Sequence, residues 1–249
     1  MESTSYIRRD SVSKKKNIKI ICYINGFTSL HSFDFPVQAD FFDYLKNLDF
    51  YFIPEKDHAY KLNNLGINAH YVPFFVDPFK YRSVKIPKFF DALFVGEVNE
   101  NWANNRRIFL QEVSKKARTL IVSMSKSNIK EAINIRNIKY ENIVNLLHSS
   151  SNIVFGSDYL PSVEPYNKHI LDPIIPYASN LKYTIRARMF TVLGSAAAYV
   201  VEDHKSVTEL FEKNHEILTW SNLDELINII KISKSNDKFI QKIGLNGRK

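Results

Sequence analysis

The sequence has a single cysteine and no long apolar run. Cys22 is alone among 249 residues, which excludes an intramolecular disulfide and a zinc site built from several cysteines. No stretch approaches the roughly 18 consecutive apolar residues that a membrane-spanning helix needs. The apolar run at 18–24 is interrupted by Lys19 and is too short for the core of a signal peptide. We therefore expect a cytoplasmic protein, with peripheral membrane contact left open.

Several common catalytic motifs are also missing. The sequence contains no Gly-x-x-x-x-Gly-Lys, Gly-x-Gly-x-x-Gly, Gly-x-Ser-x-Gly or His-Glu-x-x-His pattern, which argues against the usual NTPase, dinucleotide, hydrolase and zinc-protease sites. Asp-x-Asp is absent as well. That absence argues against a transferase that holds a diphosphate through a divalent metal, so we expect no metal site.

The net charge is positive but not concentrated. The formal charge is +8, with 24% charged residues, and the lysines are scattered among asparagines and isoleucines. A basic nucleic-acid-binding protein is therefore one alternative, although no zinc, RNP-type or helix-turn-helix signature accompanies the charge. A basic cleft for a phosphate-rich ligand explains the charge equally well.

The dominant pattern along the chain is a strand followed by a helix. Apolar runs predict strands and amphipathic segments predict helices. The expected strands are 18–24, 50–53, 69–72, 91–96, 119–124, 151–155 and 196–201, and the expected helices are 37–47, 56–65, 106–117, 139–147, 183–193, 207–212 and 223–232. This alternation predicts an α/β protein built from Rossmann-like parallel sheets.

Composition divides the chain into three parts. Residues 1–17 are polar and basic and form an expected disordered tail. Three prolines within 73–88, mixed charge and no periodicity indicate a linker. We therefore predict a partial N-terminal Rossmann-like domain with its linker at 18–84 and a C-terminal domain at 85–249.

The segment around residue 188 carries the strongest functional signal. Arg186 and Arg188 stand at the start of a predicted helix, where free N–H groups and the helix dipole favour an anion, and forked guanidinium groups suit a diphosphate. Gly194 is expected to end this helix in a left-handed cap. A helix–strand unit with two solvated arginines is the alternative interpretation.

Two motifs resemble those of the group 1 glycosyltransferases with the GT-B fold, especially the branch of spore-maturation protein CgeB. Arg188-Met189-Phe190-Thr191, followed by Leu193-Gly194-Ser195-Ala196, is similar to the donor-side helix of that branch. Thr191 stands where the family has a glutamate that contacts the ribose. Phe94-Val95-Gly96 resembles the first strand of the donor domain, which precedes a helix beginning near an arginine, here Arg106 or Arg107.

The resemblance covers most of residues 49–245 and implies a function. It implies metal-independent transfer of a sugar from a nucleoside-diphosphate sugar, as co-substrate without any other cofactor, to a glycan, lipid-linked or protein acceptor. The donor would contact Gly96, Arg186, Arg188, Thr191 and Gly194. The short stretch before the linker implies an incomplete N-terminal domain. The alternative is a non-catalytic or truncated GT-B-like binding or scaffold protein.

No catalytic base can be assigned from the sequence, but three segments offer candidates. His31 lies near Asp34 in a loop after the first predicted strand, and a structural role is the favoured interpretation. Residues 202–204, Glu-Asp-His, follow a buried strand, where a polar turn that caps the next helix is favoured. The Pro-rich loop 161–183, which contains Tyr166, Asn167 and Lys168, is long enough to be a lid for donor or acceptor.

Overall fold

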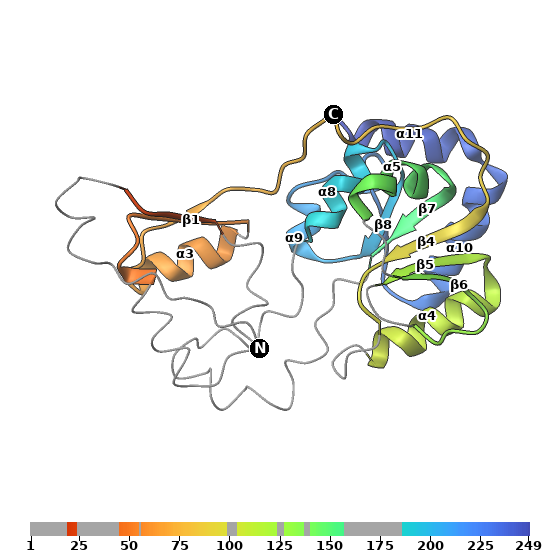
Figure 1. Ribbon diagram of the computed structural model, residues 1–249, viewed down its shortest axis with the longest axis horizontal. Helices are drawn as coiled ribbons and strands as arrows, with labels where there is room; N and C mark the ends of the chain where they lie inside the picture. The colour runs from red at the N-terminus through yellow and green to blue at the C-terminus, as the bar shows by residue number, and fades with distance from the viewer. Residues whose placement is uncertain are drawn as a thin grey trace. The chain divides into compact units, whose positions relative to one another are not determined.

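The protein forms two compact units, Met1–Pro73 and Phe74–Lys249 (Figure 1). The computed structural model describes residues 19–23, 45–54, 56–98, 104–123, 127–136, 140–156 and 186–249. Each unit is described by itself.

The first unit is built on a parallel sheet. Within its described residues, β1 (Ile21–Tyr23), β2 (Phe50–Ile53) and β3 (Ala69–Tyr71) pair side by side in that order. Helix α3 (Lys56–Asn64) connects β2 to β3. Gly66, at a φ of +78°, turns the chain after α3, since glycine takes positive φ values without steric cost.

The residues of the first sheet alternate between two faces, as the pleat of a strand requires. Tyr51, Ile53 and Ala69 are buried together with Leu62 of α3. On the other face, the rings of Phe50, Phe52 and His70 contact one another, with centroids 5.7–6.3 Å apart.

The described part of the second unit contains a six-stranded, fully parallel sheet. Its strands lie in the order β6-β5-β4-β7-β8-β9. They are β4 (Phe90–Val95), β5 (Thr119–Ser123), β6 (Ile133–Arg136), β7 (Ser151–Phe155), β8 (Tyr199–Glu202) and β9 (Leu218–Trp220). The chain builds outward from β4 to β6, then returns to β7 and builds the other way. In such doubly wound sheets, ligands bind at the carboxyl ends of the two central strands, where the direction changes.

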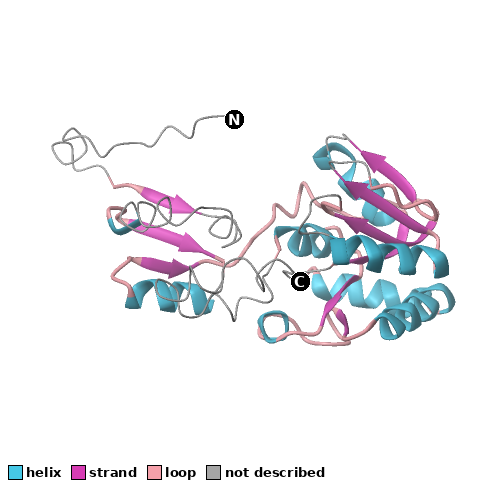
Figure 2. Cartoon of the chain, turned by 90° about the horizontal axis from the view of Figure 1, so that it is seen from below, coloured by secondary structure: helices cyan, strands magenta, loops and turns pink. Residues whose placement is uncertain are grey.

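Helices cover both faces of this sheet (Figures 1 and 2). The helices of one face are α4 (Asn104–Lys116), α10 (Leu223–Ser235) and α11 (Asp237–Gly247), and those of the other are α5 (Tyr140–Ser149), α8 (Ala187–Gly194) and α9 (Lys205–Thr208). Phe94 and Phe155 point into the first layer, whereas Leu93 and Val154 point into the second. The predicted α/β class with parallel sheets is thus confirmed.

Three described elements escaped prediction from the sequence, namely the strands β6 and β9 and helix α11. Strand β6 is a short edge strand whose residues are largely exposed, so it lacks the apolar run by which buried strands are recognised. Helix α11 begins after Asn236, whose side chain accepts a hydrogen bond from Phe239 N. This cap is an ordinary helix-start signal, and together with Ile240 and Ile243 it could have revealed the helix.

The expected left-handed cap at Gly194 is wrong. Gly194 is the last residue of α8, Ser195 has a φ of −80°, and the positive φ of 54° belongs to Ala196. Gly194 is required for packing instead, because a Cβ atom there would lie 2.9 Å from Cγ2 of Val76. Ala196 N closes the turn by donating to Leu193 O at 2.8 Å.

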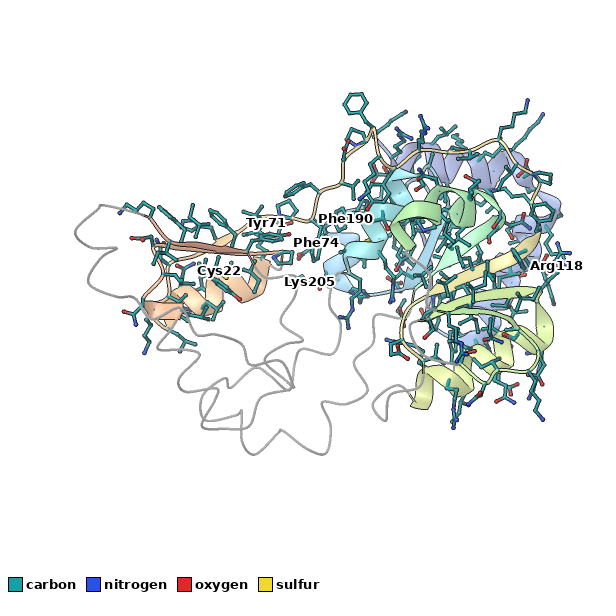
Figure 3. All side chains as sticks on the ribbon, in the orientation of Figure 1. Cys22, Tyr71, Phe74, Arg118, Phe190 and Lys205 are labelled. Atoms are coloured by element: carbon teal, nitrogen blue, oxygen red, sulfur yellow. The ribbon has the colours of Figure 1, made fainter. Side chains whose placement is uncertain are left out.

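The predicted linker is irregular in structure but is attached to the second unit. Asn145 of α5 accepts from Arg82 N at 3.0 Å and donates to Lys80 O at 2.8 Å. Val84 N donates to Ser149 Oγ at 2.9 Å. Phe74 packs its ring against Phe190 of α8 with centroids 5.6 Å apart (Figure 3). These contacts fix the start of β4 relative to α5 and α8.

Candidate functional site

The turn after β4 lies at the carboxyl edge of the sheet, next to β7. Gly96 N donates to Val122 O at 2.9 Å, and Gly96 has a φ of +156°. A Cβ atom on Gly96 would lie 2.7 Å from Nη1 of Arg188 and 3.1 Å from Cζ of Phe94. Glycine is therefore needed here both for the backbone conformation and for the approach of an arginine.

Arg188 reaches this turn from the first turn of α8. Its Nη1 donates to Val95 O at 2.8 Å, and its Cζ lies 5.5 Å from the centroid of the Phe94 ring. Arg186 precedes the helix as its N-cap residue, and the first turn contains no acidic residue. The structure therefore brings together Gly96 and Arg188, which the sequence analysis selected separately.

A second guanidinium group comes from α4. Arg106 is only 6% exposed, and its Nη1 donates to Glu97 O at 3.0 Å. Its Cζ lies 5.8 Å from the centroid of the same Phe94 ring. Of the two arginines that the sequence left open, Arg106 is thus the one at the turn. The turn thus holds two guanidinium groups together with the Glu97 carboxylate, which accepts from Val98 N. The N-terminus of α8 adds N–H groups that favour an anion.

Thr191 lies one turn further along α8. Its Oγ1 donates to Arg188 O at 2.8 Å, so the hydroxyl proton is engaged by the helix itself and the oxygen lone pairs remain for accepting a bond. A glutamate here would reach further and carry charge. Gly194 lies at the opposite end of α8 from Arg188, against Val76 and Tyr81, and its assignment to donor binding stays a prediction.

The neighbouring strands contribute Gly156, Glu202 and His204. Gly156 follows β7, and a Cβ atom there would lie 2.0 Å from Oη of Tyr199. Glu202 and His204 are buried at the end of β8. His204 is the N-cap residue of α9 but makes no side-chain capping bond. The predicted polar turn is therefore at the expected place, without side-chain capping by the histidine.

Several candidates lie outside the described residues: His31 and Asp34, the loop residues Tyr166, Asn167 and Lys168, and the tail 1–17. Among the residues that the structure does describe, no group of three or more His, Cys, Asp or Glu side chains is placed to hold a metal ion. In the same part of the chain, no helix combines the length and the hydropathy of a membrane span.

A buried histidine of α5, His148, contacts the residue that follows α8. His148 Nδ1 is 3.0 Å from Ser195 Oγ, and both residues are almost fully buried. Burial lowers the pKa of His148 to about 3, because an apolar environment disfavours the charged imidazolium. Since neither side chain reaches the surface, we assign this pair a structural role.

This burial predicts acid sensitivity. Between pH 6.5 and about 3, the unfolded chain binds a proton at residue 148 that the folded chain does not, so the free energy of unfolding falls as pH falls. Relative to a His148→Asn variant, the wild type should lose roughly 2 kcal/mol between pH 7 and pH 5. Urea unfolding of both proteins at the two pH values measures this difference. Parallel loss in both proteins would contradict a neutral buried His148.

The sequence analysis did not single out Phe94 or Gly156 as site residues. Phe94 lies in an apolar run and resembles any core residue by pattern. Gly156 carried a usable signal, since it ends a predicted buried strand in the same way that Gly96 does. In a parallel sheet the carboxyl ends of strands meet at one edge, so two glycines at two such ends are expected to lie near one site.

Comparisons with known proteins agree with this fold. A family model described as "Glycosyl transferase-like" matches residues 104–249. Among solved structures, sucrose-phosphate synthase from Thermosynechococcus elongatus is similar, with 11% identity, a TM-score of 0.65, and coverage of 95% of this chain and 64% of that chain. Anabaena Alr3699/HepE in complex with UDP-glucose is 9% identical, with a TM-score of 0.63, and the match covers 95% of this chain and 68% of that chain.

A third similar structure is a mutant of S. aureus TarM in complex with fondaparinux, α-GlcNAc-glycerol and UDP. It is 11% identical, with a TM-score of 0.62, and the match covers 94% of this chain and 47% of that chain. The chain thus spans between about half and two thirds of the length of these neighbours. No curated protein matches the chain in sequence. With more than half of its residues matched, the chain belongs to the glycosyl transferase-like family, and its parallel α/β architecture is that of the GT-B glycosyltransferases.

Proposed function

We propose that this protein transfers a sugar from a nucleoside-diphosphate sugar to an acceptor without using a metal ion, and that residues 85–249 are the donor-binding domain. The observation that carries the proposal is the position of Arg188. Its guanidinium group is fixed on Val95 O, at the carboxyl end of a central strand and beside the N-terminus of α8. This is the place where a doubly wound sheet binds a phosphate ligand.

The proposed chemistry follows from the charges at this edge. Departure of the sugar leaves a nucleoside diphosphate, whose negative charge grows as the glycosidic bond breaks. Arg188 and Arg106, which are already bonded to the turn, would stabilise that charge together with Arg186 through their forked donors. The free N–H groups at the start of α8 would add to the effect, and Thr191 would accept a bond from the ribose. His31 is proposed as a candidate base in the acceptor reaction.

UDP is the first nucleotide to test. The HepE neighbour was solved with UDP-glucose and the TarM mutant with UDP. Within the family, the motif from Arg188 to Phe190 supports the proposal that the chain belongs to the CgeB-like branch. Glycans, lipid-linked sugars and proteins are the proposed acceptor classes.

Thermal unfolding of the purified chain tests donor binding. The ligands to compare are UDP-, GDP-, TDP- and CMP-sugars. At about 100 times its dissociation constant, the correct nucleotide sugar should raise the midpoint temperature of unfolding by about 5 °C or more, because a ligand that binds only the folded state stabilises it. Arg188→Ala should remove this shift. EDTA should leave it unchanged if arginines rather than a metal hold the diphosphate.

Arg118→Ala is the matched control. Arg118 also lies near a phenylalanine of β4, with its Cζ 6.0 Å from the Phe90 ring centroid, but at the beginning of the strand rather than at its end (Figure 3). This variant should keep the full nucleotide shift. A shift that both variants retain, or that EDTA abolishes, would contradict the proposed site.

A non-catalytic donor-binding protein is the second candidate, favoured by Thr191. Because threonine is uncharged, the ribose would lose the charged partner that the resemblance implies at this position, and the Thr191 hydroxyl, which donates to its own helix, could only accept a bond. This candidate predicts nucleotide binding without sugar transfer or hydrolysis. Strongly tightened donor binding in Thr191→Glu, with no activity in the wild type, would favour it over the transferase.

A further inference from the structure

We propose that Phe94 is a positioning residue, whose buried ring holds Arg106 and Arg188 at the turn and thereby sets the affinity of the site for a diphosphate. This inference rests on the proposed donor site and deepens it. It assigns a role to a side chain that has no polar atom and does not need to touch the ligand.

The contacts around the ring define an arrangement of two arginines on one aromatic group. The Cζ atoms of Arg188 and Arg106 lie 5.5 and 5.8 Å from the Phe94 ring centroid. Each guanidinium is also tied to the backbone of the same turn, Arg188 through Val95 O and Arg106 through Glu97 O. Two arginines from helices on opposite faces of the sheet therefore converge on one ring.

The ring itself is rigidly placed. Phe94 is fully buried in β4, and its ring contacts that of Phe155 in β7 at 5.6 Å and 48°. Gly96 closes over it, since a Cβ atom at that residue would lie 3.1 Å from Phe94 Cζ. A ring held in this way offers a fixed surface to both cations.

Electrostatics explains why an aromatic ring matters at this position. Arg106 has lost most of its water, being 6% exposed. The negative face of an aromatic ring attracts a cation within about 6 Å, and more strongly when the cation is desolvated. A ring shared by both groups therefore helps to hold both cations at the turn in the absence of ligand. Guanidinium groups that are already ordered lose less entropy when a diphosphate binds.

The test compares two leucine substitutions with different expected effects. Phe94→Leu removes the ring beneath both arginines, while Phe90→Leu removes a ring of the same strand that lies near Arg118, at the opposite end of β4 from the site. Both variants should lose stability. Only Phe94→Leu should weaken UDP binding, by roughly tenfold, measured by calorimetry. The affinity for uridine, which has no phosphate, should change less than about twofold in either variant.

The uridine measurement separates positioning from general damage to the fold. A merely structural role for Phe94 would weaken UDP and uridine alike, or would make the two leucine variants equivalent. Either result would overturn the inference. If Phe94→Leu does not fold, phenylalanine with a fluorinated ring at residue 94 keeps the packing and weakens the negative face. UDP affinity should then fall with increasing fluorination, and constant affinity would overturn the inference.

A ligand-free measurement separates this inference from the proposed function. The side-chain NMR signals of Arg106 and Arg188 should be shifted and well ordered in the wild type, and should lose this ordering in Phe94→Leu. Failure of every nucleoside diphosphate to bind the wild type would reject the donor site, while ordered arginine signals that depend on Phe94 would still support the positioning role. Unchanged arginine signals in Phe94→Leu would reject that role.

Discussion

Gly96→Ala is expected to reduce donor affinity by about 100-fold while costing about 1–3 kcal/mol of stability. A Cβ atom at residue 96 would lie 2.7 Å from Nη1 of Arg188, so the guanidinium must move away from Val95 O. The end of an arginine side chain moves at little cost, and the stability loss therefore comes mainly from the backbone strain at a φ of +156°. Donor affinity should fall because the guanidinium group of Arg188 leaves the position in which it would bind the diphosphate. Nucleotide titration and urea unfolding measure the two effects.

Gly66→Ala is the matched control for backbone strain. Gly66 also has a positive φ, of +78°, but nothing lies within 4 Å of the atom that alanine would add. Its variant should lose a similar amount of stability and keep donor binding unchanged. If Gly96→Ala binds the donor as well as Gly66→Ala does, the approach of Arg188 to this turn has no role in donor recognition.

Gly156→Ala is expected to cost about 3 kcal/mol of stability, a large overpacking effect. The added Cβ would lie 2.0 Å from Oη and 2.8 Å from Cζ of Tyr199. Unlike the end of Arg188, this ring is fully buried and cannot move away without disturbing the strands β7 and β8. Because Gly156 is at the carboxyl end of β7, donor affinity should fall as well. Denaturant unfolding measures the stability loss.

The double variant Gly156→Ala/Tyr199→Phe identifies the cause. Removing the hydroxyl removes the closest of the clashing atoms, so the double variant should recover part of the stability that Gly156→Ala loses. The single variant Tyr199→Phe completes the cycle and corrects for the bonding of the hydroxyl itself. Strictly additive losses would show that the added methyl group does not meet the tyrosine hydroxyl.

Local pattern predicted the central part of the fold well. The predicted strands 50–53 and 151–155 coincide with β2 and β7, because each contains a short apolar run bounded by polar or turn residues, which marks a strand directly. The edge strand β6 has no such run. Its four residues, Ile-Asn-Ile-Arg, alternate between apolar and polar types, but an alternation this short is a weak strand signal. The cap expected at Gly194 failed for another reason. Contacts with Val76 and Tyr81, more than 100 positions earlier in the chain, explain that glycine.

The site was predicted in its parts but not in its arrangement. Arg186 and Arg188 were identifiable because a helix start is a local feature that the sequence marks directly, and Gly96 was identified through the resemblance of residues 94–96 to a family motif. The partnership of Arg188 with Val95 O spans 93 positions, and no local pattern encodes it. Phe94 was named only as part of the motif at 94–96 and received no role of its own, because a buried aromatic residue has the same sequence signature whether it fills the core or holds two cations.

The sequence by itself determined the alternation of strands and helices, the parallel α/β class and the chemical types present at the candidate site. These follow from periodicity and from the preferences of single residues, which act over a few positions. The tertiary structure decided which of those residues meet. Sheet order brought the ends of β4 and β7 together, and packing of α4 and α8 placed Arg106 and Arg188 on one ring. Such contacts depend on the folding of distant segments against each other, because burial and hydrogen bonding favour whole arrangements of segments rather than individual positions.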